Sequence, residues 1–275
     1  MELVKPLPLY LDGHAHYTLT SYGPASIVLD RLQTSDEDVE LALQATVMRM
    51  GGHPGDVNDA WVRKTFSGLH GVDELRTLIK RQIADSDEQV LEEQKTEKCI
   101  VELTKRLVQS VPQRDINAIR ESLVGALCLD LKEQNLTLDQ FRIQSGMTET
   151  EMQIMFDEEA RQAAEQEAAL DALVDHYRLN ISDEELASLI AGDANLSASD
   201  IDGMLRELKT NNQYNDARSF ALRNLALRMF MDEARYTYRI ETKEEAEQRR
   251  AQMRRELQIA ADIPTKKEYP HLKLV

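Results

Sequence analysis

The spacing of hydrophobic residues changes near residue 35, and this change divides the chain into an extended start and a helical remainder. Before it, polar and apolar residues alternate over residues 16–20 and again over residues 26–29, with a Gly-Pro pair between them. Alternation in segments rich in Tyr, Thr, Ile and Val is typical of strands. We therefore expect residues 1–34 to form an extended linker that contains a β-hairpin or strand pair.

Beyond this point hydrophobic residues recur every three to four positions, which predicts amphipathic helices. Val39, Leu43 and Val47 share one face of a first helix, and a short helix around Trp61 follows. A very long helix is then predicted from about residue 71 to 110. Apolar stripes mark its two ends, whereas its middle is charged and predicts a solvated helical span.

Two arm helices are predicted between about residues 112 and 178. Pro112 suits the start of the first, because a helix does not use the N–H of its first residues. Thr148 and Glu151 form a capping box that opens the second. Ser182 and Glu185 form a second capping box, which opens another helix.

The last packed helix is predicted over residues 214–238, where apolar residues occur almost all round. A helix of this kind is buried or faces a partner. We expect residues 35–240 to form one helical domain and residues 241–275 to form a charged C-terminal helix and tail.

Composition supports a mainly α-helical protein. The 275 residues are 42% hydrophobic and 30% charged, with only 11 Gly, 7 Pro and 5% aromatic residues, which favours helices over sheets. The net charge of -16 argues against nucleic-acid binding, which needs a basic surface. No apolar run approaches the roughly 20 residues of a membrane span, and the N-terminus is a poor signal peptide. A cytoplasmic protein with no membrane partner is expected.

The sequence offers no catalytic constellation. It has no glycine-rich phosphate loop followed by Lys and Ser or Thr, and its six histidines and two cysteines lack metal-ligand spacing. Cys99 and Cys128 are expected to be buried thiols rather than a disulfide. Carboxylates fall on helix starts and polar faces. We therefore expect no enzyme activity, no metal site and no cofactor.

Four segments carry a family resemblance, namely residues 22–43, 56–81, 101–141 and 145–190. Their order and spacing resemble the linker and C-terminal domain of the trigger factor family over about residues 20–240. Gly51–Gly55 stands where that family carries its prolyl-isomerase domain, and the ribosome-docking domain has no counterpart. Periplasmic parvulin-type chaperones share a related helical core, and the motifs do not separate the two families.

The resemblance implies an elongated multi-helix chaperone domain with helical arms. It implies an ATP-independent holdase that binds unfolded or nascent polypeptide through apolar patches, without isomerase activity and without the usual ribosome docking. Self-association through such a patch is a further expectation. The alternative is a dedicated interaction or scaffold protein that holds a single partner on the same fold.

Flexible Met side chains suit contact with varied clients. The candidate contacts lie on the second arm helix and on the last packed helix, and each is weighed against an ordinary role in the core. They are Met147, Met152, Met155, Phe156, Met229, Phe230 and Met231.

Overall fold

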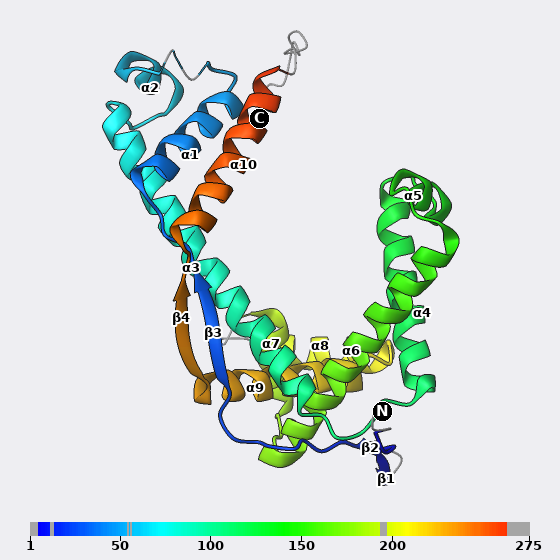
Figure 1. Ribbon diagram of the computed structural model, residues 1–275. Helices are drawn as coiled ribbons and strands as arrows, with labels where there is room; N and C mark the ends of the chain where they lie inside the picture. The colour runs from blue at the N-terminus through cyan, green and yellow to red at the C-terminus, as the bar shows by residue number, and fades with distance from the viewer. Residues whose placement is uncertain (1–4, 12–13, 54, 56, 193–196, 263–275) are drawn as a thin grey trace. The chain divides into compact units, whose positions relative to one another are not determined.

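The computed structural model describes residues 5–11, 14–53, 55, 57–192 and 197–262 (Figure 1). The described chain is mainly α-helical with a short β segment near its N-terminus, as the sequence predicts. The helices are α1 (Asp36–Arg49), α2 (Asp59–Thr65), α3 (Val72–Lys105), α4 (Gln113–Glu133), α5 (Leu138–Gln144), α6 (Glu149–Tyr177), α7 (Asp183–Ala191), α8 (Ala198–Thr210), α9 (Tyr214–Glu233) and α10 (Lys243–Asp262). The strands are β1 (Leu9–Leu11), β2 (His14–His16), β3 (Ser26–Arg31) and β4 (Arg235–Ile240).

The chain folds into two compact units, and it passes from one to the other three times. Unit 1 contains residues 1–27 and 96–235, and unit 2 contains residues 28–95 and 236–275. Helix α3 and strand β3 each contribute residues to both units.

Unit 1 is built on two helix pairs that share α6. On one side α6 packs against α4, where Ala160 and Ala164 pack with Ile116. On the other side α6 packs against α9, and the guanidinium of Arg223 joins them through two bonds to the carboxylate of Asp171, at 2.7 and 2.8 Å. Small alanines let the helices approach closely, because little side chain separates the two backbones.

Helices α7, α8 and α9 form a smaller cluster at the C-terminal end of α6. Its buried residues are Ile181, Leu186, Leu205 and Ala221. The N-terminal segment runs as extended chain along the end of α3, with Leu19 and Leu107 in an antiparallel bridge.

Unit 2 has a core shared by α1, α2 and the first part of α3. Its buried residues are Val39, Leu43, Val47, Val62, Leu75 and Ile79, and those of α1 and α3 are spaced at intervals of four. Helix α10 packs against α1.

The sequence-based hairpin is wrong in its pairing. Residues 16–20 do not pair with residues 26–29, because the N–H of Val108 donates to the carbonyl of Thr18 (3.0 Å) and β3 pairs with β4. Both pairings join residues more than 80 positions apart, and a local alternation pattern carries no information about such partners. The N-terminal hairpin that does form is β1 with β2, with Leu9 opposite His16.

The last packed helix also ends earlier than the sequence predicts. Helix α9 ends at Glu233 and residues 235–240 form β4. Polar and apolar side chains alternate along the segment Arg-Tyr-Thr-Tyr-Arg-Ile, and this pattern indicates a strand. The prediction missed it because the segment directly follows an apolar helix and was included in that helix. A second correction concerns the cysteines, since Cys99 is buried but Cys128 is exposed.

Candidate functional site

One stripe of α6 carries two of the predicted contact residues. Met152, Phe156, Ala160 and Ala164 follow one another at intervals of four and therefore share a face. Ala160 and Ala164 pack against α4, and Met152 and Phe156 are only 8% and 6% exposed. In this structure the two side chains lie within the packing of the arm hairpin, which we define as α4, α5 and α6.

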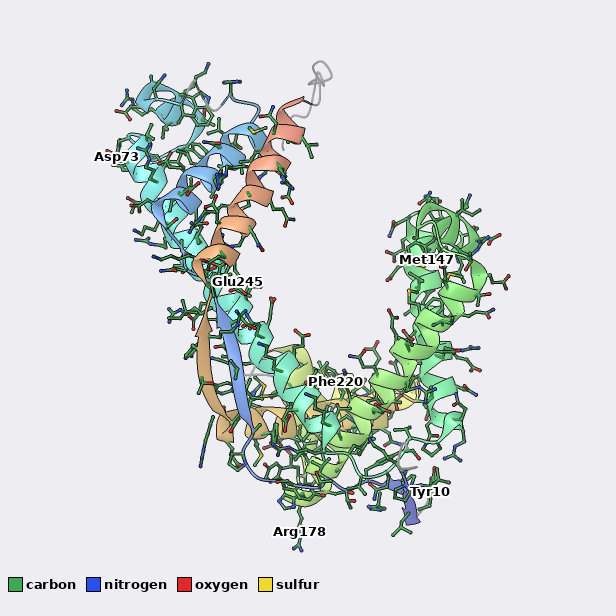
Figure 2. All side chains as sticks on the ribbon, viewed as in Figure 1. Tyr10, Asp73, Met147, Arg178, Phe220 and Glu245 are labelled. Atoms are coloured by element: carbon green, nitrogen blue, oxygen red, sulfur yellow. The ribbon has the colours of Figure 1, made fainter. Side chains whose placement is uncertain are left out.

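Two further candidates on the arm hairpin are partly accessible. Met147 lies in the turn between α5 and α6, at the tip of the hairpin (Figure 2). Its carbonyl accepts a hydrogen bond from the guanidinium of Arg142 at 3.2 Å, which fixes the turn. Met155 is half-buried, because it lies at the border of the apolar stripe. Both side chains are flexible and partly solvent-accessible, as a contact with varied partners requires.

The three candidates at the end of α9 lie in a different packing region of unit 1. Phe230 is fully buried, with the guanidinium of Arg106 5.4 Å from its ring centroid. The hydroxyl of Thr96 lies 3.9 Å from the sulfur of Met231, and Met229 is half-buried. Met231 and Phe230 thus lie beside Thr96 of α3 and Arg106 just beyond it, so the structure does not bring them together with the candidates at the hairpin tip.

The most exposed apolar side chains of the arm hairpin were not among the predicted contacts. They are Leu129 on α4, Ile143 on α5 and Ile154 on α6, which are 66%, 64% and 51% exposed. Ile154 lies two positions after Met152, on the side of α6 turned away from the buried stripe. An apolar residue placed off the apolar stripe of an amphipathic helix was the sequence signal that could have identified it. We call Leu129, Ile143 and Ile154 the arm surface.

A second apolar region of unit 1 lies on α7 and α9. Ile181, Leu189 and Leu225 line an open groove of about 670 Å³, together with polar side chains of α7. Ile190 is 46% exposed and Phe220 is 70% exposed (labelled in Figure 2). The Phe220 ring therefore leaves apolar surface in water whose burial against a partner would be favourable.

Electrostatic features of unit 1 are consistent with structural roles. Burial, with a smaller contribution from the Asp115 carboxylate, raises the pKa of Tyr17 to about 12. Burial lowers the pKa of the Arg223 guanidinium, but hydrogen bonds and charge attraction from Asp171 and Glu167 together outweigh it and raise that pKa. Tyr17 therefore stays neutral and Arg223 stays charged at physiological pH.

Among the residues that the structure describes, no group of three or more His, Cys, Asp and Glu side chains could hold a metal ion. Within the same residues, no helix combines the length and the hydropathy that crossing a membrane requires.

The fold defines a mainly α-helical protein with exposed apolar side chains on its helices. The family model described as bacterial trigger factor protein (TF) C-terminus matches residues 71–232, more than half of the chain. The chain therefore belongs to the trigger factor C-terminal domain family. The matched range contains the arm hairpin, the α7–α9 groove and all seven predicted contact residues.

Curated relatives give a weaker match. Trigger factors from two strains of Staphylococcus epidermidis are each 22% identical over 131 residues, which is 48% of this chain and 30% of the relative. The match therefore covers less than a third of the length of these relatives.

Among solved structures, a hypothetical Mycoplasma protein aligns over 81% of this chain and 90% of its own, with 11% identity and a TM-score of 0.37. Similarity at this level does not establish a shared fold.

Proposed function

We propose that this protein is an ATP-independent chaperone that holds unfolded or nascent polypeptide on apolar side chains of unit 1. The observation that carries the proposal is the exposure of Leu129, Ile143 and Ile154 on the arm hairpin of a trigger factor family member. Burying a large aliphatic side chain against a client contributes about 1.5–3 kcal/mol, so a few such contacts hold an unfolded segment reversibly.

The α7–α9 groove and Phe220 provide a second contact region in the proposal. Clients present apolar side chains at irregular intervals, and a chaperone with separate apolar regions can engage a segment at more than one of them. Two weak contacts on one chain raise the overall affinity, because the second binding event is intramolecular.

The proposal concerns the holding of polypeptide alone. The absence of prolyl-isomerase activity and of ribosome docking stays an expectation from the sequence. The cytoplasmic location expected from the N-terminal sequence stays a prediction. Met152, Phe156 and Phe230 also remain candidates for client contact, although a client would reach them only after the helices separate.

Suppression of aggregation tests the proposal. A chemically denatured client is diluted with and without the protein in the absence of nucleotide, and light scattering is followed. We expect the wild type to suppress scattering. The triple variant Leu129→Ser, Ile143→Ser, Ile154→Ser should need at least tenfold more protein for the same effect, because the loss of even one contact of about 1.5 kcal/mol weakens binding about tenfold.

A matched control replaces three exposed polar residues of the same helices, Glu133→Ser, Gln144→Ser and Glu158→Ser, and we expect it to behave as the wild type. The Leu129, Ile143 and Ile154 side chains are exposed, so their loss should leave the fold intact, which circular dichroism checks. If the wild type fails to suppress scattering, the general chaperone function is rejected and a single dedicated partner becomes the function to pursue.

A further inference from the structure

The small sheet of β3 and β4 has an open edge along β4. The N–H of Arg235 donates to the carbonyl of Ala25 at 2.7 Å, and the N–H of Glu241 donates to the carbonyl of Arg31 at 2.9 Å. In both bonds the donor residue and the acceptor residue are the same number of positions apart in the sequence, so β3 and β4 run parallel. Successive N–H groups of a strand point in opposite directions, so the N–H groups of Tyr238 and Ile240 point away from β3.

The edge formed by β3 is closed by a side chain of α3. The N–H of Asp30 donates to the Gln94 side-chain carbonyl at 2.9 Å, and the Gln94 amide nitrogen donates to the carbonyl of Asp30, also at 2.9 Å. At Asp30, the Gln94 amide thus occupies the donor and the acceptor that a third strand would use. Across the described residues this sheet has two strands, and the outer side of β4 is the edge that remains.

Apolar side chains lie beside the open edge at the spacing of a strand. Tyr236, Tyr238 and Ile240 project from one side of β4, and the last two are 52% and 63% exposed. The guanidinium of Arg31 lies 6.0 Å from the ring centroid of Tyr238, and the ammonium of Lys95 lies 5.6 Å from that of Tyr236. These cation–π contacts hold the rings in a row.

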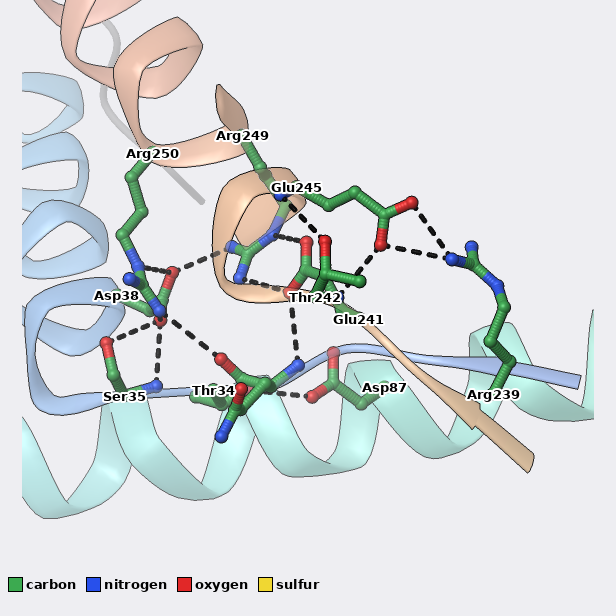
Figure 3. Close-up of polar contacts among 11 residues, drawn as sticks. Thr34, Ser35, Asp38, Asp87, Arg239, Glu241, Thr242, Glu245, Arg249 and Arg250 are labelled. Carbon is green, nitrogen blue, oxygen red and sulfur yellow. Dashed lines mark hydrogen bonds and ion pairs between the residues drawn. The ribbon is translucent and has the colours of Figure 1, made fainter. Parts of the chain in front are cut away.

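The opposite side of β4 is polar and already occupied. Arg239 bonds there to the carboxylate of Asp30 at 2.6 Å. It also bonds to the carboxylate of Glu245 at 2.9 Å, as Figure 3 shows. The strand therefore has one side held by ion pairs, one exposed apolar side, and an outer edge with outward-pointing backbone groups.

We propose that the outer edge of β4 binds an extended segment of a client polypeptide as an added third strand. Tyr238 and Ile240 supply the backbone hydrogen bonds, and the side chains of alternate client residues pack on Tyr238 and Ile240. This inference rests on the proposed function and specifies one way in which a client is held.

An extended segment is the conformation that fits this edge. Only a strand offers backbone groups in register with the edge together with side chains at two-residue spacing. A helical segment satisfies its own backbone groups and cannot make these bonds.

The test uses two substitutions at one position. Ile240→Pro removes the outward N–H, and proline is tolerated there because this N–H takes no part in the bond to β3. Ile240→Val keeps the N–H and the apolar side chain. The probe is fluorescently labelled α-lactalbumin that has been reduced and carboxymethylated so that it stays unfolded, and fluorescence anisotropy gives its affinity for each full-length variant.

We expect Ile240→Pro to weaken probe binding about three- to tenfold, the range for one lost hydrogen bond, and Ile240→Val to change it less than twofold. Amide hydrogen exchange on the wild type gives an independent readout, and we expect the amides of Tyr238 and Ile240 to exchange more slowly when the probe is bound. Unchanged exchange at both amides overturns the edge inference even if Ile240→Pro misfolds. If the wild type binds the probe without these effects, the proposed function stands and the edge inference fails; if it does not bind the probe, both fail.

Discussion

At the scale of single residues, the carboxylate of Asp38 has the most unusual environment. It is the one charged residue that is buried in the described part of the chain, with 4% of its surface exposed. It accepts bonds from the guanidinium groups of Arg249 (2.7 Å) and Arg250 (3.1 Å) and from the N–H of Ser35 (2.8 Å), as Figure 3 shows. Burial alone raises the pKa of Asp38, but bonds from Arg250, Ser35 and Arg249 outweigh it and hold that pKa well below its usual range.

Replacing Asp38 should therefore destabilise unit 2. Asp38→Asn removes the negative charge between Arg249 and Arg250. We expect the free energy of unfolding to fall by about 3 kcal/mol, which is the lower end of the range of destabilisation seen when a buried ion pair loses one partner. Urea denaturation measures the change. The control is Asp36→Asn in the same helix, whose side chain is fully exposed and whose replacement should have little effect. Equal effects of the two substitutions would contradict a special role for Asp38.

The stabilisation by Asp38 should also depend on pH. Because the pKa of Asp38 is lower in the folded protein than in the unfolded chain, the folded state is stabilised at every pH above the unfolded value of about 3.9. This stabilisation is lost as the pH falls below about 4. The difference in unfolding free energy between the wild type and Asp38→Asn should be constant from pH 8 to pH 5 and shrink below pH 4. A difference that stays constant down to pH 3 would show that the carboxylate charge is not responsible.

At the scale of elements, the helix starts are set by local side-chain bonds. The N–H of Thr148 donates to the Glu151 carboxylate at 2.7 Å, and the N–H of Glu151 donates to the Thr148 hydroxyl at 3.2 Å. The pair at Ser182 and Glu185 has the same geometry. Each pair satisfies two N–H groups that the helix leaves without partners, so the predicted capping boxes are confirmed.

The cap of α6 should stabilise the tip of the arm hairpin. Thr148→Ala removes the acceptor for the N–H of Glu151, and we expect a cost of about 1 kcal/mol in unfolding free energy, with faster amide exchange in the first turn of α6. Thr150→Ala changes an exposed threonine in that turn and should have little effect. If exchange is equally fast in both variants, the capping box does not determine where α6 begins.

At the scale of the whole molecule, the strong negative charge and the exposed apolar side chains predict different responses to salt. The net charge is -16, and charge–charge contacts with a client weaken as the screening length shortens from about 10 Å at 0.1 M salt. Contacts made by burial of apolar surface are not screened. The salt dependence of client holding therefore distinguishes the two kinds of contact.

We expect suppression of client aggregation to persist, or to improve, between 0.1 and 0.5 M NaCl. We also expect no change when ATP and magnesium are added, since the proposed function needs no nucleotide. Light scattering across a salt series measures both effects, with the client alone at each salt concentration as the control. Suppression that disappears at 0.5 M NaCl would assign the binding to charge rather than to the arm surface.

The sequence by itself determined the features that depend on near neighbours. The helical period, the capping boxes at Thr148 and Ser182, and the mainly α-helical class all follow from residues within four positions of each other, because helix hydrogen bonds and caps are local. The family resemblance drew on the same local motifs in their order along the chain.

Tertiary structure alone decided which apolar residues are buried and which strands pair. Met152 and Ile154 are two positions apart on one helix, yet the first is 8% and the second 51% exposed, because α4 covers one side of α6. Strand β3 pairs with β4, more than 200 residues along the chain, and its other edge is closed by Gln94 of α3. These outcomes depend on contacts between distant segments, and a local pattern of hydrophobic and polar residues does not specify which distant segment will supply them.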